Sequence, residues 1–201
     1  METQLHQTRE RLMDSALVVF GRRGFPDTRV EDICRAAGSA RATFYRHFSG
    51  KDEVFDALLS RLIDELDEIS SDLDPITPDR SGYLTLQRLM GELIAVAERW
   101  SAVVEALSVP RRVPAAERDR AIVAANQVSV RLGAAIDAGG VTGPDARVAA
   151  LGLVALSDGF GHQVRTWDID IDRPAVVHSV TALGMRMLHP GLDIGALGLA
   201  A

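Results

Sequence analysis

The chain of 201 residues has one cysteine and no long apolar run. A single Cys34 excludes an internal disulfide or a cysteine-rich metal cluster, and it fits a reducing compartment. No stretch approaches the roughly 20 apolar residues that a membrane span needs. The first residues, METQLHQ, are polar where a signal peptide has a basic start followed by an apolar segment. We therefore expect a cytoplasmic protein that makes no membrane contact.

Enzyme and metal-site motifs are missing as well. The sequence has no phosphate-binding glycine loop, no Gly-x-Ser-x-Gly elbow and no His-Glu-x-x-His. Its histidines have neither metal-ligand spacing nor neighbouring cysteines: His6, His47, His162, His178 and His189. We expect no catalytic residue, no metal and no cofactor. A helical enzyme unrelated to DNA stays as an alternative with little support, which a reproducible turnover would revive.

The net charge of −6 hides an uneven distribution along the chain. Residues 1–51 carry nine Lys and Arg against six Asp and Glu, a charge of +3. Residues 52–201 carry thirteen against twenty-two, a charge of −9, and the two segments sum to −6. Phosphate contacts need local cations, and a distant acidic segment screens them little beyond a Debye length of about 10 Å. The distribution favours a nucleic-acid-binding module at the N-terminal end.

Apolar residues recur at helical intervals almost throughout, and no run alternates as a strand would. We therefore predict an all-α fold. Asp74–Asp79 contains two prolines and is the clearest loop. The expected helices cover about 8–23, 28–37, 39–48, 51–73, 82–107, 115–138, 145–166 and 173–188.

The second and third of these helices form a helix-turn-helix candidate. Thr28–Glu31 has the form of a capping box, in which the Thr28 hydroxyl accepts from the backbone at Glu31 and that carboxylate reaches back. Gly38 would end the helix by adopting a positive φ, and Ser39 can cap the next one. Two helices joined by a tight glycine turn, with exposed Arg, Thr, Tyr and His on the second, are typical of DNA-binding proteins.

The same segment resembles the signature of the tetracycline-repressor (TetR) family. The resemblance rests on Thr28–Ile33, Ala36–Gly38, Thr43–Phe48 and Lys51–Phe55, and it extends back over residues 11–16 and 20–25. It covers about the first quarter of the chain, whereas the remainder is similar in length and helix pattern only. It implies a helical homodimer whose body encloses an effector pocket, with ligand binding that weakens operator binding. The domains implied are a helix-turn-helix DNA-binding domain over residues 1–50 and a helical effector-binding and dimerisation domain over residues 51–201.

Carried over position by position, the resemblance assigns the DNA contacts. Arg41 and Ala42 are expected to read base edges, and an arginine can bond a guanine through two donors. The residues expected to contact phosphate are Thr28, Arg29, Thr43, Tyr45, His47 and Lys51. The sequence departs from the family after Gly38, where Ser39 and Ala40 replace an apolar residue and a serine cap. This departure could shift the cap by one residue, and Gly50 likewise stands where a stronger cap is common.

The segment Ala146–Gly161 contains only two charged residues and would be apolar around most of its circumference. A central core helix is one interpretation, and a two-helix dimer face is the one we favour, with Leu153, Leu156, Phe160 and Val164 turned to the core. Two helices from each subunit would then form an isologous four-helix interface. The residues expected in it are Val148, Leu151, Ala155, Val176, Val180, Leu183 and Met187.

An effector cavity would be mostly apolar with a few polar groups. The candidate lining residues are Met90, Leu93, Trp100, Val104, Gln127, Phe160 and His162, and for each of them ordinary core packing is the competing interpretation. The sequence thus predicts a sequence-specific DNA-binding repressor released from its operator by a small apolar or amphipathic ligand. The alternative is a ligandless regulator that responds to a protein partner or acts as an architectural DNA binder.

Overall fold

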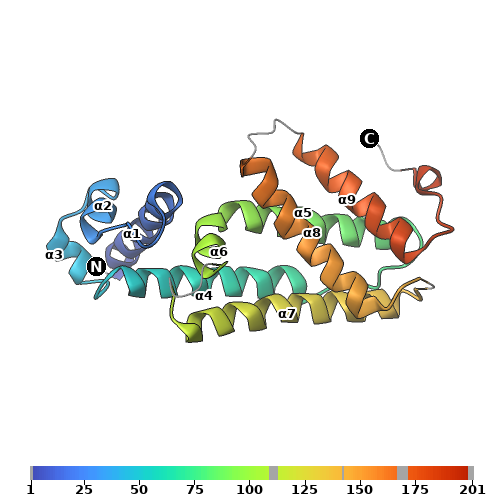
Figure 1. Ribbon diagram of the computed structural model, residues 1–201, viewed down its shortest axis with the longest axis horizontal. Coiled ribbons are helices and arrows are strands. Elements are labelled where there is room, and N and C mark those ends of the chain that lie inside the picture. Colours follow the sequence, from blue (N-terminus) through green and yellow to red (C-terminus); the bar gives the residue numbers. More distant parts are fainter. Residues whose placement is uncertain (1, 109–112, 142, 167–171, 199–201) are drawn as a thin grey trace. The chain divides into compact units, whose positions relative to one another are not determined.

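The computed structural model describes residues 2–108, 113–141, 143–166 and 172–198, with the side chains of 2, 3 and 160–166 excepted. These residues form helices joined by loops and contain no strand, which confirms the all-α class (Figure 1). The helices are α1 (Glu2–Arg23), α2 (Val30–Ala36), α3 (Arg41–Tyr45), α4 (Lys51–Ser70), α5 (Arg80–Arg99), α6 (Ser101–Ser108), α7 (Ala115–Ala138), α8 (Ala146–Thr166) and α9 (Arg173–Leu188), followed by a 3-10 turn at Ile194–Leu197.

Most predicted helices are present, and one is divided. The loop at Asp74–Asp79 lies between α4 and α5 as expected, and α7, α8 and α9 begin and end within one residue of their predicted bounds. The segment expected as one helix over 82–107 is broken into α5 and α6 at Trp100, whose carbonyl accepts from the backbone N–H of Val103 and Val104. No glycine or proline marks this break in the sequence.

The chain forms two compact units. The first contains residues 1–64 and 99–122, and the second contains residues 65–98 and 123–201, so that α4 and α7 contribute to both. In the first unit α6 packs against α1, and α1 packs against α2. This unit is larger than the DNA-binding domain expected over residues 1–50. The boundary of the DNA-binding domain therefore stays a prediction.

Three phenylalanines form the centre of the first unit. The ring centroids of Phe25 and Phe55 lie 4.7 Å apart, and those of Phe20 and Phe25 lie 5.2 Å apart in an edge-to-face arrangement. All three side chains are buried. Because these residues come from α1, from the turn after it and from α4, their packing joins α1 and this turn to the beginning of α4.

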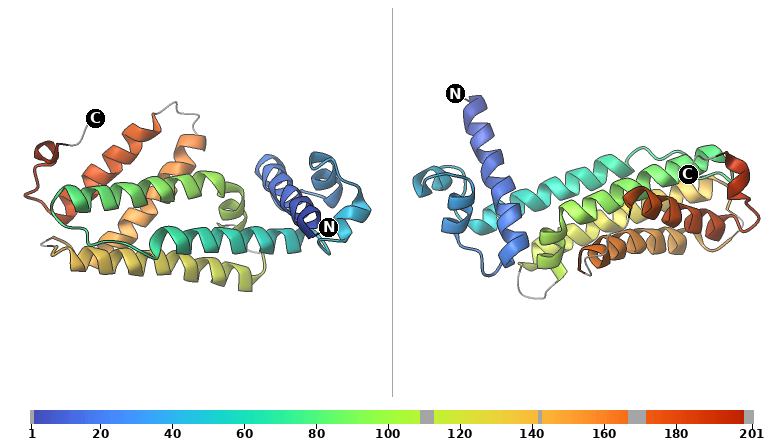
Figure 2. Two further views of the ribbon diagram at one scale, coloured as in Figure 1. Left: turned by 180° about the vertical axis from the view of Figure 1, so that it is seen from behind. Right: turned by 90° about the horizontal axis from the view of Figure 1, so that it is seen from above.

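The second unit has a separate core formed by α5, α7, α8 and α9. In it α8 and α9 lie side by side (Figures 1 and 2). The loop after α4 closes this core with Ile76, whose N–H donates to the Ala135 carbonyl at 2.9 Å. The Ile76 carbonyl lies 3.1 Å from Nε2 of the buried His189. Of the helices described, none is both long and apolar enough to cross a membrane.

Candidate DNA interface

The turn between α2 and α3 has the predicted glycine geometry. Gly38 adopts φ +58°, a conformation that side chains with a Cβ rarely take. The N–H of Ser39 donates to the Cys34 carbonyl at 2.9 Å, which closes the end of α2. The expectation of a positive φ at Gly38 is therefore confirmed.

The cap of α2 lies one residue later than expected. The N-cap is Arg29, whose N–H donates to the Asp32 carboxylate at 3.1 Å, so Asp32 takes the role expected for Glu31. The Thr28 hydroxyl instead donates to the Gly24 carbonyl at 2.8 Å. The predicted capping box of Thr28 and Glu31 is wrong, because the end of α1 leaves a carbonyl that Thr28 satisfies.

The cap of α3 has moved as the departure from the family indicated. Its N-cap is Ala40, which has no side-chain hydrogen bond, and α3 begins at Arg41. The cap expected at Ser39 is wrong, and the shift by one residue is confirmed. A helix of one turn without a side-chain cap depends on its packing for stability.

Phe44 provides that packing and sets the outer face of α3. Its side chain is fully buried, and its ring stands edge-on to Tyr45 at a centroid distance of 5.4 Å. Phe48 is also buried, beneath the Arg9 guanidinium, whose central carbon lies 4.9 Å from the ring centroid. With Phe44 turned inward, Arg41, Ala42 and Tyr45 are exposed together on the outer face.

Arg41 has two partners within the protein. Its Nη1 lies 2.5 Å from the Glu31 carboxylate, and its Nη2 donates to the Tyr45 hydroxyl at 3.3 Å. The guanidinium carbon also lies 5.7 Å from the centroid of the Tyr45 ring. The hydrogen bond to Tyr45, followed by the charge of Glu31, raises the pKa of Arg41 further above its usual range. Arg41 is therefore a fixed cation at the start of α3.

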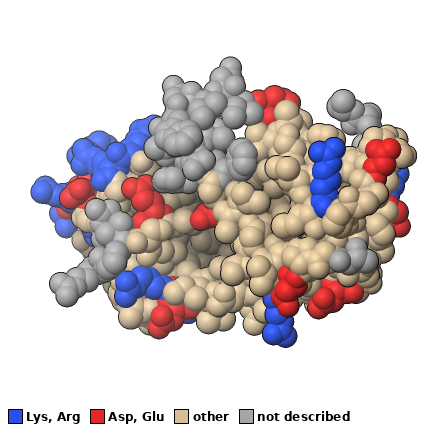
Figure 3. Space-filling model, turned by 45° about the vertical axis from the view of Figure 1, so that its right-hand side comes forward, with Lys and Arg blue, Asp and Glu red and all other residues tan. Residues whose placement is uncertain are grey.

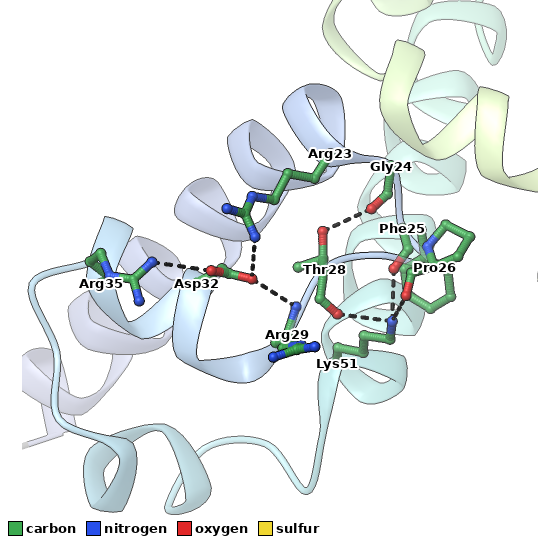
Figure 4. A network of polar contacts seen from close by, with 9 residues as sticks. All are labelled: Arg23, Gly24, Phe25, Pro26, Thr28, Arg29, Asp32, Arg35 and Lys51. Carbon is green, nitrogen blue, oxygen red and sulfur yellow. Dashed lines mark hydrogen bonds and ion pairs between the residues drawn. The ribbon is translucent and has the colours of Figure 1, made fainter.

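Asp32 holds two further arginines (Figure 4). Its carboxylate lies 3.1 Å from Nη1 of Arg23 and 3.1 Å from Nη1 of Arg35, while both guanidinium groups remain more than half exposed. The backbone hydrogen bond from Arg29 is the largest influence on Asp32, and together with the two arginines it lowers the pKa of this carboxyl. We did not expect Arg23 or Arg35 in the site, because only the charge count over residues 1–51 pointed to them.

Lys51 is occupied by the protein itself. Its Nζ donates to the carbonyls of Phe25 at 2.8 Å, Pro26 at 2.8 Å and Thr28 at 2.9 Å (Figure 4). An ammonium group has three N–H donors, so all three are used. Nζ also lies 4.8 Å from the centroid of the Phe25 ring. In the DNA-free chain its ammonium group thus joins α4 to the turn after α1, and the expected phosphate contact by Lys51 stays a prediction.

Thr28 is likewise bonded within the protein, and its expected phosphate contact stays a prediction. Its side chain is 2% exposed and its single hydroxyl hydrogen goes to Gly24, so it has no donor left for a phosphate. Arg29 is exposed and Thr43 is half-buried. Nε2 of His47 is buried and has no hydrogen-bond partner among the described residues.

The start of α4 is secured without a side chain at Gly50. The Glu53 carboxylate accepts from the backbone N–H of Ser49 at 2.6 Å, and this bond lowers the pKa of Glu53. Together with Lys51, Glu53 holds the first turn of α4, where Gly50 offers no side-chain cap.

The surface carries its cations unevenly. Figure 3 shows one dense group of Lys and Arg side chains at the upper left of the face drawn, whereas the charges elsewhere on that face are scattered. Along the sequence, the excess of Lys and Arg over Asp and Glu lies in residues 1–51. A local concentration of cations is what binding to phosphate requires.

The structure brings together only part of the predicted effector lining. Met90 and Leu93 lie in one buried cluster of the second unit. Trp100 and Val104 belong to the first unit, and Gln127 is exposed. The side chains of Phe160 and His162 lie outside the described residues.

Five of the seven residues expected in the dimer face are exposed in the single chain. Val148, Leu151 and Leu183 are 67%, 57% and 61% exposed, and Ala155 and Met187 are exposed as well. Val176 and Val180 are buried in the core of their own unit, and their place in the dimer face stays a prediction. Leu156, expected in the core, is 47% exposed, whereas Leu153 is buried as expected.

Comparison with known proteins finds a similarity that is strongest over the helix-turn-helix. Residues 12–58 match the model of the bacterial regulatory proteins of the tetR family. Over 54 residues the chain is 46% identical to the uncharacterized HTH-type transcriptional regulator TtgW of Pseudomonas putida, and the match covers 27% of this chain and 40% of that relative. The chain thus spans less than half of this relative.

Two further matches extend over most of the chain. The HTH-type transcriptional regulator TtgR, also of Pseudomonas putida, is 27% identical over 205 aligned residues, covering 94% of this chain and 96% of that relative. The structure of the regulator FadR from Bacillus subtilis in complex with stearoyl-CoA matches at a TM-score of 0.65 and 18% identity, covering 90% of this chain and 99% of FadR. With the helix-turn-helix described above, these findings show that residues 12–58 are similar to the DNA-binding region of the tetR family of bacterial regulatory proteins, and that the fold of the chain is similar to that of FadR.

Proposed function

We propose that this protein is a sequence-specific transcriptional regulator that binds double-stranded operator DNA as a homodimer. The observation that carries the proposal is the outer face of α3, where Arg41, Ala42 and Tyr45 are exposed because Phe44 is buried beneath them. A short helix held on its inner side and carrying an arginine at its first residue has the form of a helix that enters the major groove.

The DNA contacts divide into readers and positioning residues. Arg41 and Ala42 face the base edges in this proposal, and Tyr45, Thr43, Arg29 and His47 contact phosphates. The exposed guanidinium groups of Arg23 and Arg35 add phosphate contacts, since Asp32 fixes both beside α2. Contacts of this kind set the orientation on the duplex and make binding salt-dependent.

The exposed apolar side chains of α8 and α9 form the dimer face in this proposal. We define this α8/α9 face by Val148, Leu151, Ala155, Leu183 and Met187. A contiguous apolar surface of this kind is costly when left in water, and a two-fold interface covers it with its own copy.

We further propose that the protein is a cytoplasmic repressor released by a small apolar or amphipathic ligand. The FadR structure that it resembles was solved with stearoyl-CoA, an amphipathic molecule with a long apolar chain. Met90 and Leu93, in the largely apolar interior of the second unit, are the residues that we propose as part of the ligand site.

Selection of duplexes from a randomised pool, followed by fluorescence anisotropy, tests the function. We expect an enriched palindromic sequence whose affinity falls steeply with salt. The double variant Arg41→Ala/Tyr45→Ala should lose at least about tenfold in affinity, since one bidentate base contact is worth roughly 1–3 kcal/mol. Arg88→Ala, which removes an exposed arginine from the second unit, is the matched control. Failure to enrich any sequence would contradict the proposal.

A further inference from the structure

Glu31 contacts the residue that we propose as the base reader. It lies in the first turn of α2, and its carboxylate meets Nη1 of Arg41 at the first position of α3. Tyr45 holds Nη2 of the same guanidinium from the last position of α3. The side chains of Arg41 and Glu31 are 59% and 43% exposed. An acid is therefore exposed at the centre of a surface that, by the proposed function, faces a polyanion.

This contact leaves Arg41 able to recognise a base. A guanidinium has five N–H donors in a rigid fork, two on each terminal nitrogen and one on Nε. Glu31 and Tyr45 take one position on each terminal nitrogen, so a second position on each and Nε remain. Two of these suffice for the O6 and N7 acceptors of guanine.

The same contact makes Arg41 a poor ligand for phosphate. The Glu31 carboxylate offsets the charge of Arg41, and it repels the phosphate oxygens that would approach the guanidinium. A correctly placed guanine is held by directed hydrogen bonds to neutral acceptors, which lose less from this neutralisation. The acid therefore weakens binding to an arbitrary duplex more than binding to the operator.

We propose that Glu31 is a specificity-determining residue, which holds Arg41 in position for base reading and suppresses its use as a phosphate contact. This inference rests on the proposed function. It adds an acidic residue to the interface, although acids are ordinarily unfavourable there. Specificity is a ratio of two affinities, and it improves when the wrong complex is weakened.

The test uses Glu31→Gln in the full chain. Affinity is measured across a salt series for the duplex selected by the wild-type protein and for a scrambled duplex of equal length and composition. We expect the scrambled duplex to bind roughly tenfold more tightly near 0.1 M salt. For this duplex, the slope of log affinity against log salt concentration should become more negative by about 1.8, because two additional phosphate contacts form per dimer. The selected duplex should change much less, so that the ratio falls.

Two further variants separate specificity from simple charge. Asp27→Asn makes the same charge change at an exposed position of the first unit, and we expect it to shift both duplexes equally. Glu31→Asp keeps the charge but shortens the side chain. It should retain the weak binding to the scrambled duplex while broadening the base preference when binding sites are selected again. Thermal unfolding checks that each variant is folded.

The outcomes distinguish this inference from the proposed function. If the wild-type protein enriches no sequence, the proposed function fails and the role of Glu31 fails with it. If the wild-type protein discriminates but Glu31→Gln gives the same ratio as Asp27→Asn, the proposed function stands and the role of Glu31 is overturned.

Discussion

Lys51 stabilises the fold, although its charge and position suggest a contact with DNA phosphate. It is the only lysine in the chain. The sequence places it at a helix N-terminus, where the helix dipole favours binding of an anion. The three carbonyls that surround its Nζ come from residues more than twenty positions earlier. These partners could not be predicted from the sequence, because the three carbonyls converge only after α1, the turn that follows it and α4 have packed.

We predict that Lys51→Met destabilises the protein by about 1–3 kcal/mol, because three carbonyls lose a charged donor. Lys51→Arg should not restore stability, since a planar fork cannot reproduce three converging bonds. Urea unfolding measures both variants. A variant with unchanged unfolding that lost one phosphate contact from its salt dependence would instead identify Lys51 as a DNA ligand.

Arg41 and Phe44 show which part of the site the sequence did predict. The outward Arg41 and inward Phe44 follow from their positions on a short helix, and both expectations agree with the exposure observed. The partners of Arg41 were not predicted. Glu31 had been interpreted as part of a cap, and the shift of that cap to Arg29 and Asp32 leaves Glu31 free to meet Arg41.

At the scale of elements, α2 depends on its first turn. This helix of seven residues starts with the Asp32 carboxylate bound to the Arg29 N–H, and the same carboxylate reaches Arg23 and Arg35. An acid here also complements the positive end of the helix dipole. The ionised form of Asp32 is therefore part of the structure of α2.

The lowered pKa of Asp32 predicts a pH dependence. A depressed folded-state pKa contributes stability that is fully present above the unfolded value, about 3.9, and is lost as pH falls through the folded value. The stability difference between the wild-type protein and Asp32→Asn should thus be constant above about pH 5 and shrink below it. Urea midpoints from pH 6 to pH 3 measure this difference. A difference that did not change with pH would contradict the role of the carboxylate.

Helices were predicted better than their ends. The long elements α7, α8 and α9 follow from apolar periodicity and from the glycine and proline segments that separate them. The break at Trp100 and the cap at Arg29 escaped prediction, whereas the shift of the α3 cap to Ala40 was indicated by the departure from the family pattern. They depend on hydrogen bonds and packing that a local pattern does not encode, such as the bond from Thr28 to Gly24.

At the scale of the whole molecule, the proposed dimer depends on the α8/α9 face. Its apolar residues are exposed in the single chain, so replacing them should leave the fold of the subunit intact. Burial of this face against a second copy would join two DNA-binding domains. A two-fold dimer of this kind binds a palindrome whose half-sites lie about 34–36 Å, or a multiple of it, apart along the DNA.

We predict that Leu151→Glu/Leu183→Glu gives a folded monomer, because charges on both helices would be buried without partners at a two-fold interface. Sedimentation equilibrium measures the mass, and circular dichroism checks the helices. Val130→Glu, at another exposed apolar position on α7, is the control that should remain dimeric. A double variant that stayed dimeric would place the interface elsewhere.

The single lysine has a consequence for the chemistry of the protein. Its ammonium group is the only side-chain amine in the chain, and all of its protons are engaged by backbone carbonyls. An acylating reagent can modify this amine only after it leaves those carbonyls and loses a proton. The rate of its acylation, followed by mass spectrometry, therefore reports how often the Lys51 Nζ leaves the three carbonyls of the turn after α1, without any introduced label.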